Sequence, residues 1–333
     1  MDNLTMKNIK IIATGGTIAG RAASSTQLTG YTAGAYSVED LLSSVPALGD
    51  IAHISGEQLC NIDSSSLTDE LLLRLAQRCN ELLAQEDIDG LVITHGTDTM
   101  EETAFFLNLT VKSTKPVVLV GSMRPATAVS ADGPLNIINA ARVAVCAESE
   151  GQGVLVVMND EIYSGRDVTK TNTENVATFK APNGGPLGFV VDGSVRYYYR
   201  SARPHTTSSE FAVKTLVKLP RVDIIYTHVG EDRVFVDAAC AAGAEGLVYA
   251  GSGMGSIHEG AEAALAEAAE RGVIVVRSSR TGSGLVTAGL ERWQQAGFLH
   301  ADNLNPQKAR LLLQLALTKT HERSEVQRLF DKY

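Results

Sequence analysis

Short apolar runs that alternate with longer helix-patterned segments are the feature that most constrains the fold of this chain. Four runs rich in Val, Ile and Leu have the composition of buried strands, at residues 9–13, 90–94, 116–121 and 153–158. Three segments of helical pattern lie between them, at residues 67–85, 100–109 and 135–147. Such alternation indicates a parallel sheet with helices on both faces. We therefore predict an α/β fold with a doubly wound, mainly parallel sheet.

A second, smaller α/β pattern occupies the last third of the chain. The total of 333 residues is long for one domain and favours two. After a polar stretch at 201–210, strand-like runs at 222–227, 246–250 and 273–277 alternate with helix-like runs at 236–242, 261–271 and 307–317. Asn305 and Pro306 mark a helix start, since Asn caps helices and Pro is tolerated in the first turn. We predict an N-terminal catalytic domain over residues 1–200, a linker over 201–220 and a smaller C-terminal α/β domain over 221–333.

The charge and hydropathy of the chain favour a small-molecule ligand. The net charge of −9 and the pI near 5.3 argue against nucleic acid or a membrane surface as partner, because both require a basic protein face. No apolar stretch approaches the roughly 20 residues that span a bilayer, and residues 1–10 lack the apolar core of a secretory signal. We expect a soluble protein, cytoplasmic as the sequence stands and periplasmic if a signal peptide was removed.

The cysteine, histidine and glycine patterns predict neither a metal nor a cofactor. The four cysteines have no CxxC spacing, and the seven histidines form no HExxH or HxH pattern. The glycines at 15 and 16 lack the GxGxxG spacing of a dinucleotide-binding loop, and no P-loop occurs. We expect reduced, structural cysteines and a site built from side chains and backbone alone.

Two threonine-containing segments each follow a predicted strand. Residues 14–17 (TGGT) follow the first run, and residues 94–99 (THGTDT) follow the second. In an open α/β sheet, ligands bind at the carboxyl ends of the strands, so we expect Thr17 and Thr97 in one crevice. The glycines allow the backbone to pass close to a ligand and to turn its N–H groups toward a carboxylate or an oxyanion. One such segment alone is more simply an ordinary glycine turn, but the pair favours an active site.

A lysine and a tyrosine are further candidates for this site. Lys170 lies in a loop beyond the strand-like run that ends at residue 158, and Asp98 directly follows Thr97. A lysine beside a threonine hydroxyl can take up or share its proton, which activates a weak nucleophile. Tyr31 lies in a glycine-flanked segment that can close over the site as a lid and hydrogen-bond Thr17. The competing interpretations are a solvated surface lysine and an exposed loop tyrosine.

The chain resembles the bacterial type II L-asparaginases and the related glutaminase-asparaginases. Residues 11–20 and 93–103 are similar to the two signature segments of that family. The resemblance covers nearly the whole chain, through residues 121–125, 130–134, 157–160, 170–173 and 304–310. It implies a two-domain α/β fold, hydrolysis of a side-chain amide through an acyl-enzyme, and a homotetramer with active sites at the interface of an intimate dimer.

The resemblance also implies catalytic roles for five residues. Thr17 would be the primary nucleophile, with Tyr31 hydrogen-bonded to it in the closed lid. Thr97, Asp98 and Lys170 would form a second catalytic group that assists proton transfer and activates water. Which threonine attacks first stays open at the level of sequence.

Further residues would bind the substrate, by the same resemblance. Backbone N–H groups near Gly16 and Thr97 would hold the oxyanion. Asp98 would bind the α-ammonium group of the substrate and Ser64 its α-carboxylate. Ser65 stands where many family members have Gln or Glu, so one contact to the substrate backbone would be lost or made through water.

Three positions depart from the family pattern in ways that affect specificity or compartment. Ser256 replaces an asparagine of the more asparagine-selective members, which predicts appreciable glutaminase activity. Glu291 is the acidic candidate for a substrate contact across the subunit interface, although the local alignment needs a gap. The loop disulfide of some secreted members is not matched, because Ser113 occupies the position of one cysteine and only Cys79 falls near the other.

These observations predict an amidohydrolase that converts L-asparagine to L-aspartate and ammonia, with L-glutamine as secondary substrate. One alternative is the amidotransferase subunit that acts on mischarged tRNA, but the acidic charge and the absence of an extra domain oppose it. Another is a non-catalytic amino-acid-binding or sensing module with the same fold. Both threonines together with Lys170 oppose that reading, because binding alone needs no hydroxyl nucleophile beside a proton acceptor.

Overall fold

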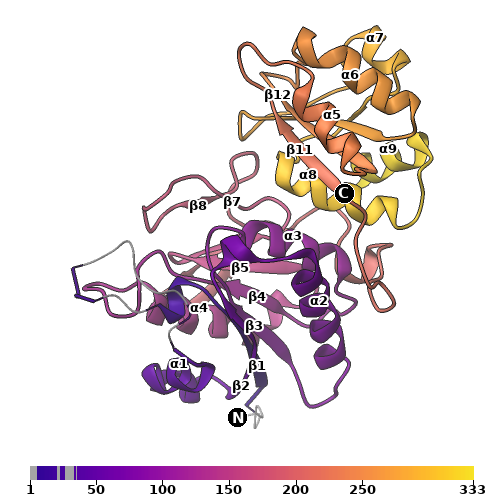
Figure 1. Cartoon of the computed structure of the whole chain (residues 1–333). Coiled ribbons are helices and arrows are strands. Elements are labelled where there is room, and N and C mark those ends of the chain that lie inside the picture. Colours follow the sequence, from indigo (N-terminus) through magenta and orange to yellow (C-terminus); the bar gives the residue numbers. More distant parts are fainter. Residues whose placement is uncertain (1–5, 21–22, 27–33, 35) are drawn as a thin grey trace. The chain divides into compact units, whose positions relative to one another are not determined.

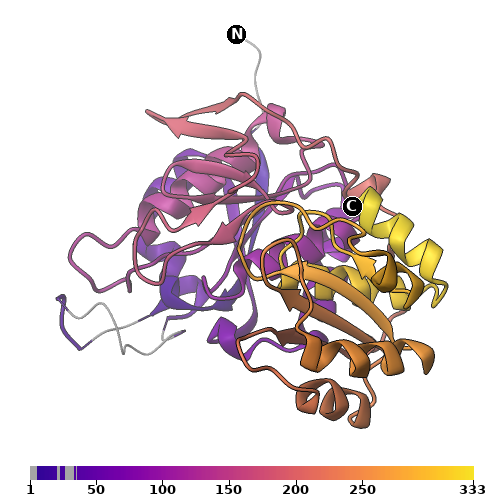
Figure 2. The ribbon, with the colours of Figure 1, turned by 90° about the horizontal axis from the view of Figure 1, so that it is seen from above.

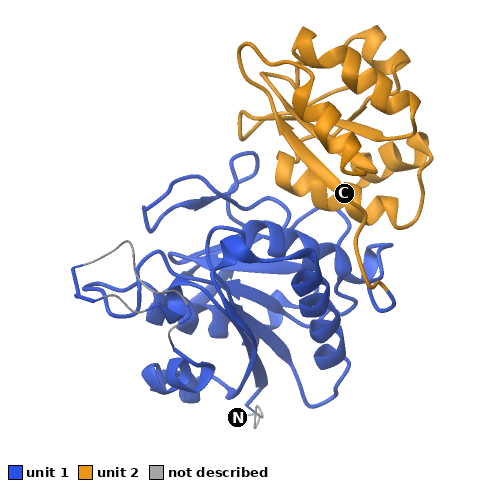
Figure 3. Cartoon of the chain, in the orientation of Figure 1, with its two compact units in different colours: residues 1–215 blue, residues 216–333 orange. Residues whose placement is uncertain are grey.

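The computed structural model describes residues 6–20, 23–26, 34 and 36–333, which divide into two compact units (Figure 3). Unit 1 comprises Met1–Thr215 and unit 2 comprises Leu216–Tyr333. Both units consist of a sheet with helices on its faces, and the sheet of unit 1 is the larger. The predicted α/β class, with a larger N-terminal part and a smaller C-terminal part, is confirmed.

No helix within the described ranges combines the length and the apolar character needed to cross a membrane.

Unit 1 is built on an eight-stranded sheet in the order β10-β9-β6-β5-β4-β3-β1-β2. Strands β1 to β5 pair in parallel, and β6, β9 and β10 extend the sheet with antiparallel pairing. Their bounds are β1 Asn8–Gly15, β2 His53–Ile62, β3 Gly90–Thr94, β4 Val117–Val120, β5 Val154–Met158, β6 Glu161–Ser164, β9 Gly188–Val191 and β10 Ser194–Tyr197.

Helices cover both faces of this sheet, which explains why its central strands are apolar throughout. The helices are α1 Val38–Ser44, α2 Asp69–Leu83, α3 Met100–Thr110 and α4 Gly133–Val145. Figure 1 shows α1 and α4 on one side of the strands and α2 and α3 on the other. Every residue of β3, β4 and β5 is buried, as expected for parallel strands covered on both faces.

The order of the strands changes direction at β1. The chain passes from β1 to β2 on one side and then crosses to β3 on the other side of β1. Such a switch in strand order opens a crevice outside the carboxyl ends of the two strands, and ligands bind there. The turns η1 (Thr17–Ala19) and η3 (Ser64–Ser66) follow β1 and β2 at this edge. A separate two-stranded hairpin, β7 (Thr169–Lys170) and β8 (Phe179–Lys180), lies outside the large sheet (Figure 1).

Unit 2 has a four-stranded parallel sheet in the order β11-β12-β13-β14. Its elements are β11 Val222–Tyr226, α5 Val234–Ala241, β12 Gly246–Gly251, α6 Glu259–Glu270, β13 Ile274–Ser279, α7 Glu291–Gln295, β14 Leu299–His300, α8 Pro306–Leu317 and α9 Arg323–Lys332. One face carries α5, α6 and Trp293 of α7, and α8 packs on the other face (Figure 2). Asn305 caps α8 by accepting a hydrogen bond from the backbone N–H of Lys308, as the sequence indicated.

Each strand and helix predicted from sequence has a counterpart whose ends agree within two residues. The sequence analysis did not predict α1, β2, the strands β6 to β10, α7, β14 or α9. The edge strand β2 is only partly buried along its length and contains Glu57, Gln58 and Asn61. Its residues therefore lack the apolar signal that identified the central strands.

Candidate active site

The two threonine-containing loops are packed directly against each other at the crevice beside β1. Gly16 has a φ of 81°, and a Cβ atom added there would lie 2.4 Å from the Cα atom of Gly96. Gly15 has a φ of 103°, and its added Cβ would lie 2.5 Å from the carbonyl oxygen of Ile62. The backbone N–H of Gly16 donates to that oxygen over 3.0 Å. Only glycine permits both the left-handed backbone and this close approach.

Both candidate threonine nucleophiles are almost fully buried at this point. Thr17 begins the turn η1 and is 8% exposed, and Thr97 lies between β3 and α3 and is 5% exposed. The hydroxyl of Thr14 donates to the carbonyl oxygen of Thr94 over 2.9 Å, which ties the end of β1 to the end of β3. The loops therefore start from a shared, rigid edge of the sheet.

Lys170 brings a cation to Thr97 and Asp98 from a distant part of the chain. Its Nζ donates to Thr97 Oγ1 over 3.0 Å and to Asp98 Oδ1 over 2.6 Å. The Lys170 side chain is 17% exposed and the Asp98 side chain 57%. A hydroxyl within hydrogen-bond reach of an amine, with that amine oriented by a third group, is the arrangement required for proton transfer to and from an activated hydroxyl. The structure thus brings together three of the predicted catalytic residues.

Ser64 is buried beside the same loops, whereas Ser65 is exposed to solvent. Ser64 is 4% exposed, and a Cβ added to Gly96 would lie 2.6 Å from its Oγ. The hydroxyl of Thr99 donates to the carbonyl oxygen of Ser64 over 2.9 Å. Ser65 is exposed, and its hydroxyl donates to Asp63 Oδ1 over 2.9 Å. Only the first of the two serines is enclosed by the loops that carry the threonines.

A buried histidine that the sequence analysis did not single out supports the Thr97 loop. His95 is 1% exposed, with Nδ1 2.7 Å from the carbonyl oxygen of Gly96 and Nε2 2.9 Å from the hydroxyl of Thr103. Because a carbonyl only accepts, Nδ1 carries the proton and Nε2 accepts from Thr103. Burial lowers the pKa of His95 to about 4, so the ring is neutral near pH 7. Its position between Thr94 and Gly96 in the motif was the available signal.

The segment after β4 forms another wall of the crevice. A Cβ added to Gly121 would lie 2.7 Å from the carbonyl oxygen of His95 and 3.1 Å from Cγ2 of Thr97. The Asp132 carboxylate accepts hydrogen bonds from the backbone N–H groups of residues 123 and 124. A cavity of about 400 Å³ lies next to this segment. One wall starts at Met123, two residues after Gly121, and the other starts at Asn172, two residues after Lys170. The cavity is lined by Met123, Arg124, Asn172, Glu174, Asn175 and Val176.

Three predicted site residues do not belong to the described part of unit 1. Tyr31 falls outside the part of the chain that the structure describes. Ser256 belongs to unit 2, in a turn after β12 where its backbone N–H donates to the Ser252 carbonyl over 2.8 Å. Glu291, also in unit 2, is the first residue of α7, is exposed, and accepts a hydrogen bond from Gln295 over 3.1 Å.

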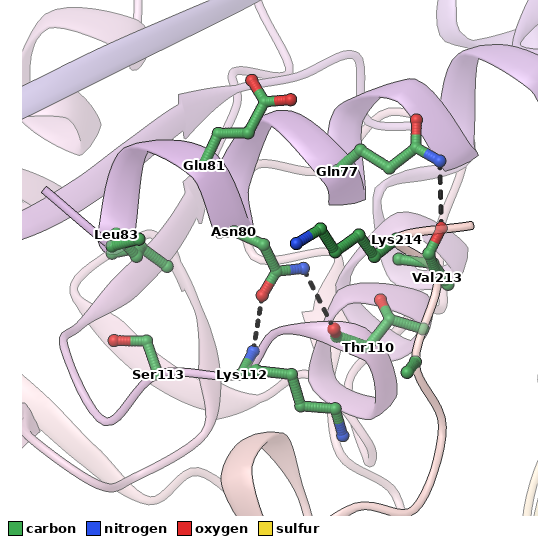
Figure 4. A pocket seen from close by; sticks show the side chains of 11 residues that line it. Gln77, Asn80, Glu81, Leu83, Thr110, Lys112, Ser113, Val213 and Lys214 are labelled. Atoms are coloured by element: carbon green, nitrogen blue, oxygen red, sulfur yellow. Dashed lines mark hydrogen bonds between the residues drawn. The ribbon is translucent and has the colours of Figure 1, made fainter. Parts of the chain in front are cut away.

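A second cavity in unit 1 lies at the far end of α3 and lacks this chemistry (Figure 4). Its volume is about 480 Å³, and its walls come from the ends of α2 and α3 and from residues 212–214. Asn80 and Gln77 hold these walls together, with bonds to the Thr110 and Val213 carbonyls. Thr97 precedes the first residue of α3, and an 11-residue helix is about 16 Å long, so the two regions are well separated.

Among the described residues no cluster of three or more His, Cys, Asp or Glu could hold a metal.

Comparison with known proteins gives a consistent result over the whole chain. Two family models match, "Asparaginase, N-terminal" over residues 8–203 and "Glutaminase/Asparaginase C-terminal domain" over residues 221–330. The chain is 51% identical over 328 residues to L-asparaginase 2 of Bacillus subtilis, covering 98% of this chain and 87% of that protein. It is 46% identical over 330 residues to a glutaminase-asparaginase of Pseudomonas fluorescens, covering 98% and 91%. A crystal structure of a probable cytoplasmic L-asparaginase from Campylobacter jejuni superposes with a TM-score of 0.96 at 50% identity, covering 98% of this chain and all of that one.

Proposed function

The chain belongs to the glutaminase/asparaginase family, and from that membership we propose that it hydrolyses L-asparagine to L-aspartate and ammonia, with L-glutamine as secondary substrate. The observation that carries this proposal is the contact between Lys170 Nζ and Thr97 Oγ1, beside a second buried threonine at the same sheet edge. A binding module would have no use for a hydroxyl held against an amine in this way.

Thr17 is the proposed nucleophile of the first half-reaction. Its hydroxyl oxygen attacks the side-chain amide carbon of asparagine, and Tyr31 holds that hydroxyl by a hydrogen bond. The hydroxyl proton passes to the amide nitrogen, the C–N bond breaks and ammonia leaves, so that an aspartyl ester remains on Thr17. Backbone N–H groups near Gly16 and Thr97 stabilise the oxyanion, and one such donor is typically worth about 3 kcal/mol in the transition state.

Thr97 and Lys170 act in the proposed second half-reaction. Water attacks the ester carbon, and the Thr97–Lys170 pair takes a proton from that water. The same proton returns to the Thr17 oxygen as the ester bond breaks, which releases aspartate and restores the enzyme. The short contact of Lys170 with Asp98 supports this role, because the carboxylate orients the amine.

The α-ammonium and α-carboxylate groups of the substrate need opposite charges or hydrogen-bond donors in the site. We assign the ammonium group to Asp98, whose half-exposed carboxylate is accessible to a ligand, and the carboxylate to the buried Ser64, with the exposed Ser65 contributing only through a water molecule. Glu291 of a second subunit is proposed as a further partner of the ammonium group. Ser256 of that subunit, a smaller residue than asparagine, leaves room for the longer side chain of glutamine.

Assembly into a homotetramer is part of this proposal. Unit 2 exposes large apolar side chains on its edge strand β11, on α5 and in the loop between them, here termed the β11–α5 patch: Ile224, Tyr226, Val229, Val234 and Phe235. Val229 is 96% exposed and Phe235 60%. An exposed edge strand bordered by apolar side chains is a typical association surface. We propose that a second copy of the chain covers this patch, because the proposed active site is shared between subunits.

Ammonia release from L-asparagine and from L-glutamine tests the proposal directly. We expect release from both, faster from asparagine, and none from the Thr17→Ala protein with unchanged circular dichroism and thermal midpoint. A Ser256→Asn protein should lower the ratio of glutamine to asparagine turnover, because the larger side chain takes up space. Absence of release from either amide, by a folded wild-type protein, would contradict the proposal and favour a binding module.

A further inference from the structure

The segment that carries Lys170 has little support of its own. Strand β7 contains two residues, Thr169 and Lys170, and pairs only with β8 in a sheet of two strands. A two-stranded hairpin of this length is not stable in isolation. The Nζ of Lys170 nevertheless lies within 3.0 Å of Thr97 Oγ1, so a contact from outside the hairpin must hold its backbone in place.

Glu101 supplies that contact from the first turn of α3. Its Oε2 accepts a hydrogen bond from the backbone N–H of Lys170 over 2.6 Å and another from the hydroxyl of Thr169 over 2.5 Å. Both residues of β7 are therefore held by one carboxylate oxygen. The Glu101 side chain is 3% exposed, and charge-assisted hydrogen bonds in such a place are short and strong.

The position of Glu101 in the sequence links this contact to the catalytic group. Helix α3 begins at Met100, directly after the loop that contains Thr97 and Asp98. The side chain of Lys170 contacts that loop, and the backbone of Lys170 contacts the helix that the loop enters. The side chain and the backbone of Lys170 are thus both hydrogen-bonded to the same short stretch of chain, residues 97–101.

We propose that Glu101 is a positioning residue that holds Lys170 against Thr97 and Asp98. The inference rests on the proposed function for its catalytic consequence. An acidic residue in the first turn of a helix is usually explained by the helix dipole and remains solvated. Glu101 is instead buried, and a buried carboxylate is costly unless its hydrogen bonds compensate. A misplacement of about 1 Å in a catalytic group can cost 10²-fold in rate, so loss of this contact should affect turnover strongly.

Steady-state kinetics of four variants test the proposal. Glu101→Ala should lower kcat for asparagine by about 10²-fold and leave KM within about threefold, because Lys170 is not assigned to substrate binding. Glu101→Gln should stay within about tenfold of wild type, since an amide oxygen at the Oε2 position can accept both hydrogen bonds. Thr169→Val, which removes one of the two donors, should fall between them. Glu102→Ala, a change at the adjacent and less buried acidic residue, is the matched control and should leave kcat unchanged.

The reactivity of Lys170 gives a readout that needs no substrate. An amine-selective acylating reagent, followed by peptide mass spectrometry, should label Lys170 several-fold faster in Glu101→Ala than in wild type, with Lys115 unchanged as internal reference. Equal labelling rates together with a lowered kcat would show that Glu101 acts by another route and would overturn the proposal. If Glu101→Ala does not fold, the kcat and labelling rate of Thr169→Val decide instead. A wild type without amidase activity would refute the proposed function, while the labelling comparison would still report on the position of Lys170.

Discussion

The two buried threonines are chemically similar, and Lys170 contacts one of them, Thr97. Thr97 Oγ1 accepts a hydrogen bond from Lys170, and Thr17 begins the turn η1, directly after Gly15 and Gly16 at the end of β1. In the proposed mechanism Thr17 carries the acyl group, and Thr97 with Lys170 activates the water that attacks the ester. The order of events is therefore open to a direct experiment.

Thr97→Val removes the hydroxyl and keeps the shape of the side chain, so it separates the two half-reactions. We expect kcat to fall by about 10²-fold or more, the usual contribution of a positioned acid–base group. Because Thr17 remains intact, an aspartyl ester should accumulate when the variant is mixed with asparagine. Intact-protein mass spectrometry after acid quenching would detect it, and digestion would locate it on the peptide containing Thr17. If Thr97→Val forms no detectable ester, or if Thr17→Ala forms one, Thr17 is not the residue that carries the acyl group.

The neutral His95 predicts a specific dependence of stability on pH. Its pKa is about 4 in the folded protein and near 6.5 in the unfolded chain. Between these values the unfolded chain binds the extra proton, so acidification favours unfolding. Stability from this group, up to about 3 kcal/mol, is complete above pH 6.5 and is lost as the pH falls toward 4.

Urea unfolding at pH 7.0 and at pH 5.0 measures this effect, with His95→Gln as comparison. We expect the loss in free energy of unfolding between the two pH values to be larger for the wild type than for the variant. Other histidines whose pKa is lowered by burial, His205 and His300, are present in both proteins and cancel in the difference. Identical losses would show that His95 does not titrate as the structure implies.

At the level of elements, the loops after β1, β2 and β3 form one packed unit. The close approach of Gly16 to Gly96 and of Gly96 to Ser64 leaves no room for a side chain at either glycine. The site depends on this contact as much as on the identity of the threonines, because the oxyanion donors are backbone groups of the same loops.

Gly16→Ala tests how far the site tolerates separation of these loops. The substitution places a Cβ 2.4 Å from Gly96 and forces alanine into a φ of 81°, so it should cost about 2 kcal/mol or more in stability. Activity should fall more steeply than stability, since the loops that hold the oxyanion must move. Gly49→Ala, where an added Cβ meets nothing within 4 Å, is the control and should change both by little. A Gly16→Ala protein with normal kcat would contradict the packing argument.

Burial explains why the central strands of unit 1 were predicted from sequence and why the edge strand β2 was missed. Residues 90–94 were identified because parallel strands covered on both faces are apolar throughout. The edge strand β2 is half polar, and β7 has two residues, so neither produces a periodic pattern. Glu101 was missed for a related reason: an acidic residue in a first helical turn is ordinary, and only its buried contact with a residue 69 positions away distinguishes it. Lys170 and Thr97 were found because their types and the motif suggested chemistry, while the distance between them required the fold.

At the scale of the whole molecule, the proposed site draws on more than one copy of the chain. Thr17, Thr97 and Lys170 belong to unit 1, whereas Ser256 and Glu291 belong to unit 2. The β11–α5 patch would lose its exposure to solvent in an assembly, which is a driving force for association.

The mass of the native protein tests the assembly. Light scattering coupled to size exclusion should give the mass of four chains at micromolar concentration. Phe235→Glu in the β11–α5 patch should shift the protein toward smaller species, because a charge in an apolar contact is costly to desolvate. Val217→Glu, a change at another highly exposed apolar residue of unit 2, is the matched control and should leave the mass unchanged. A wild-type protein of the mass of one chain would refute the tetramer.

Complementation between two defective variants tests whether subunits share a site. Thr17→Ala removes the nucleophile of one subunit, and Glu291→Gln removes the charge that a neighbour is proposed to contribute. Each protein alone should be impaired, the first completely and the second through a raised KM for asparagine, because a charged contact to the ammonium group is lost. In mixed assemblies from co-expression, some sites combine an intact Thr17 with an intact Glu291 from the partner, so part of the wild-type KM behaviour should return. Glu291→Gln with a normal KM would exclude this residue from the site, and co-expressed proteins that merely average the two homomers would place all catalytic groups on one chain.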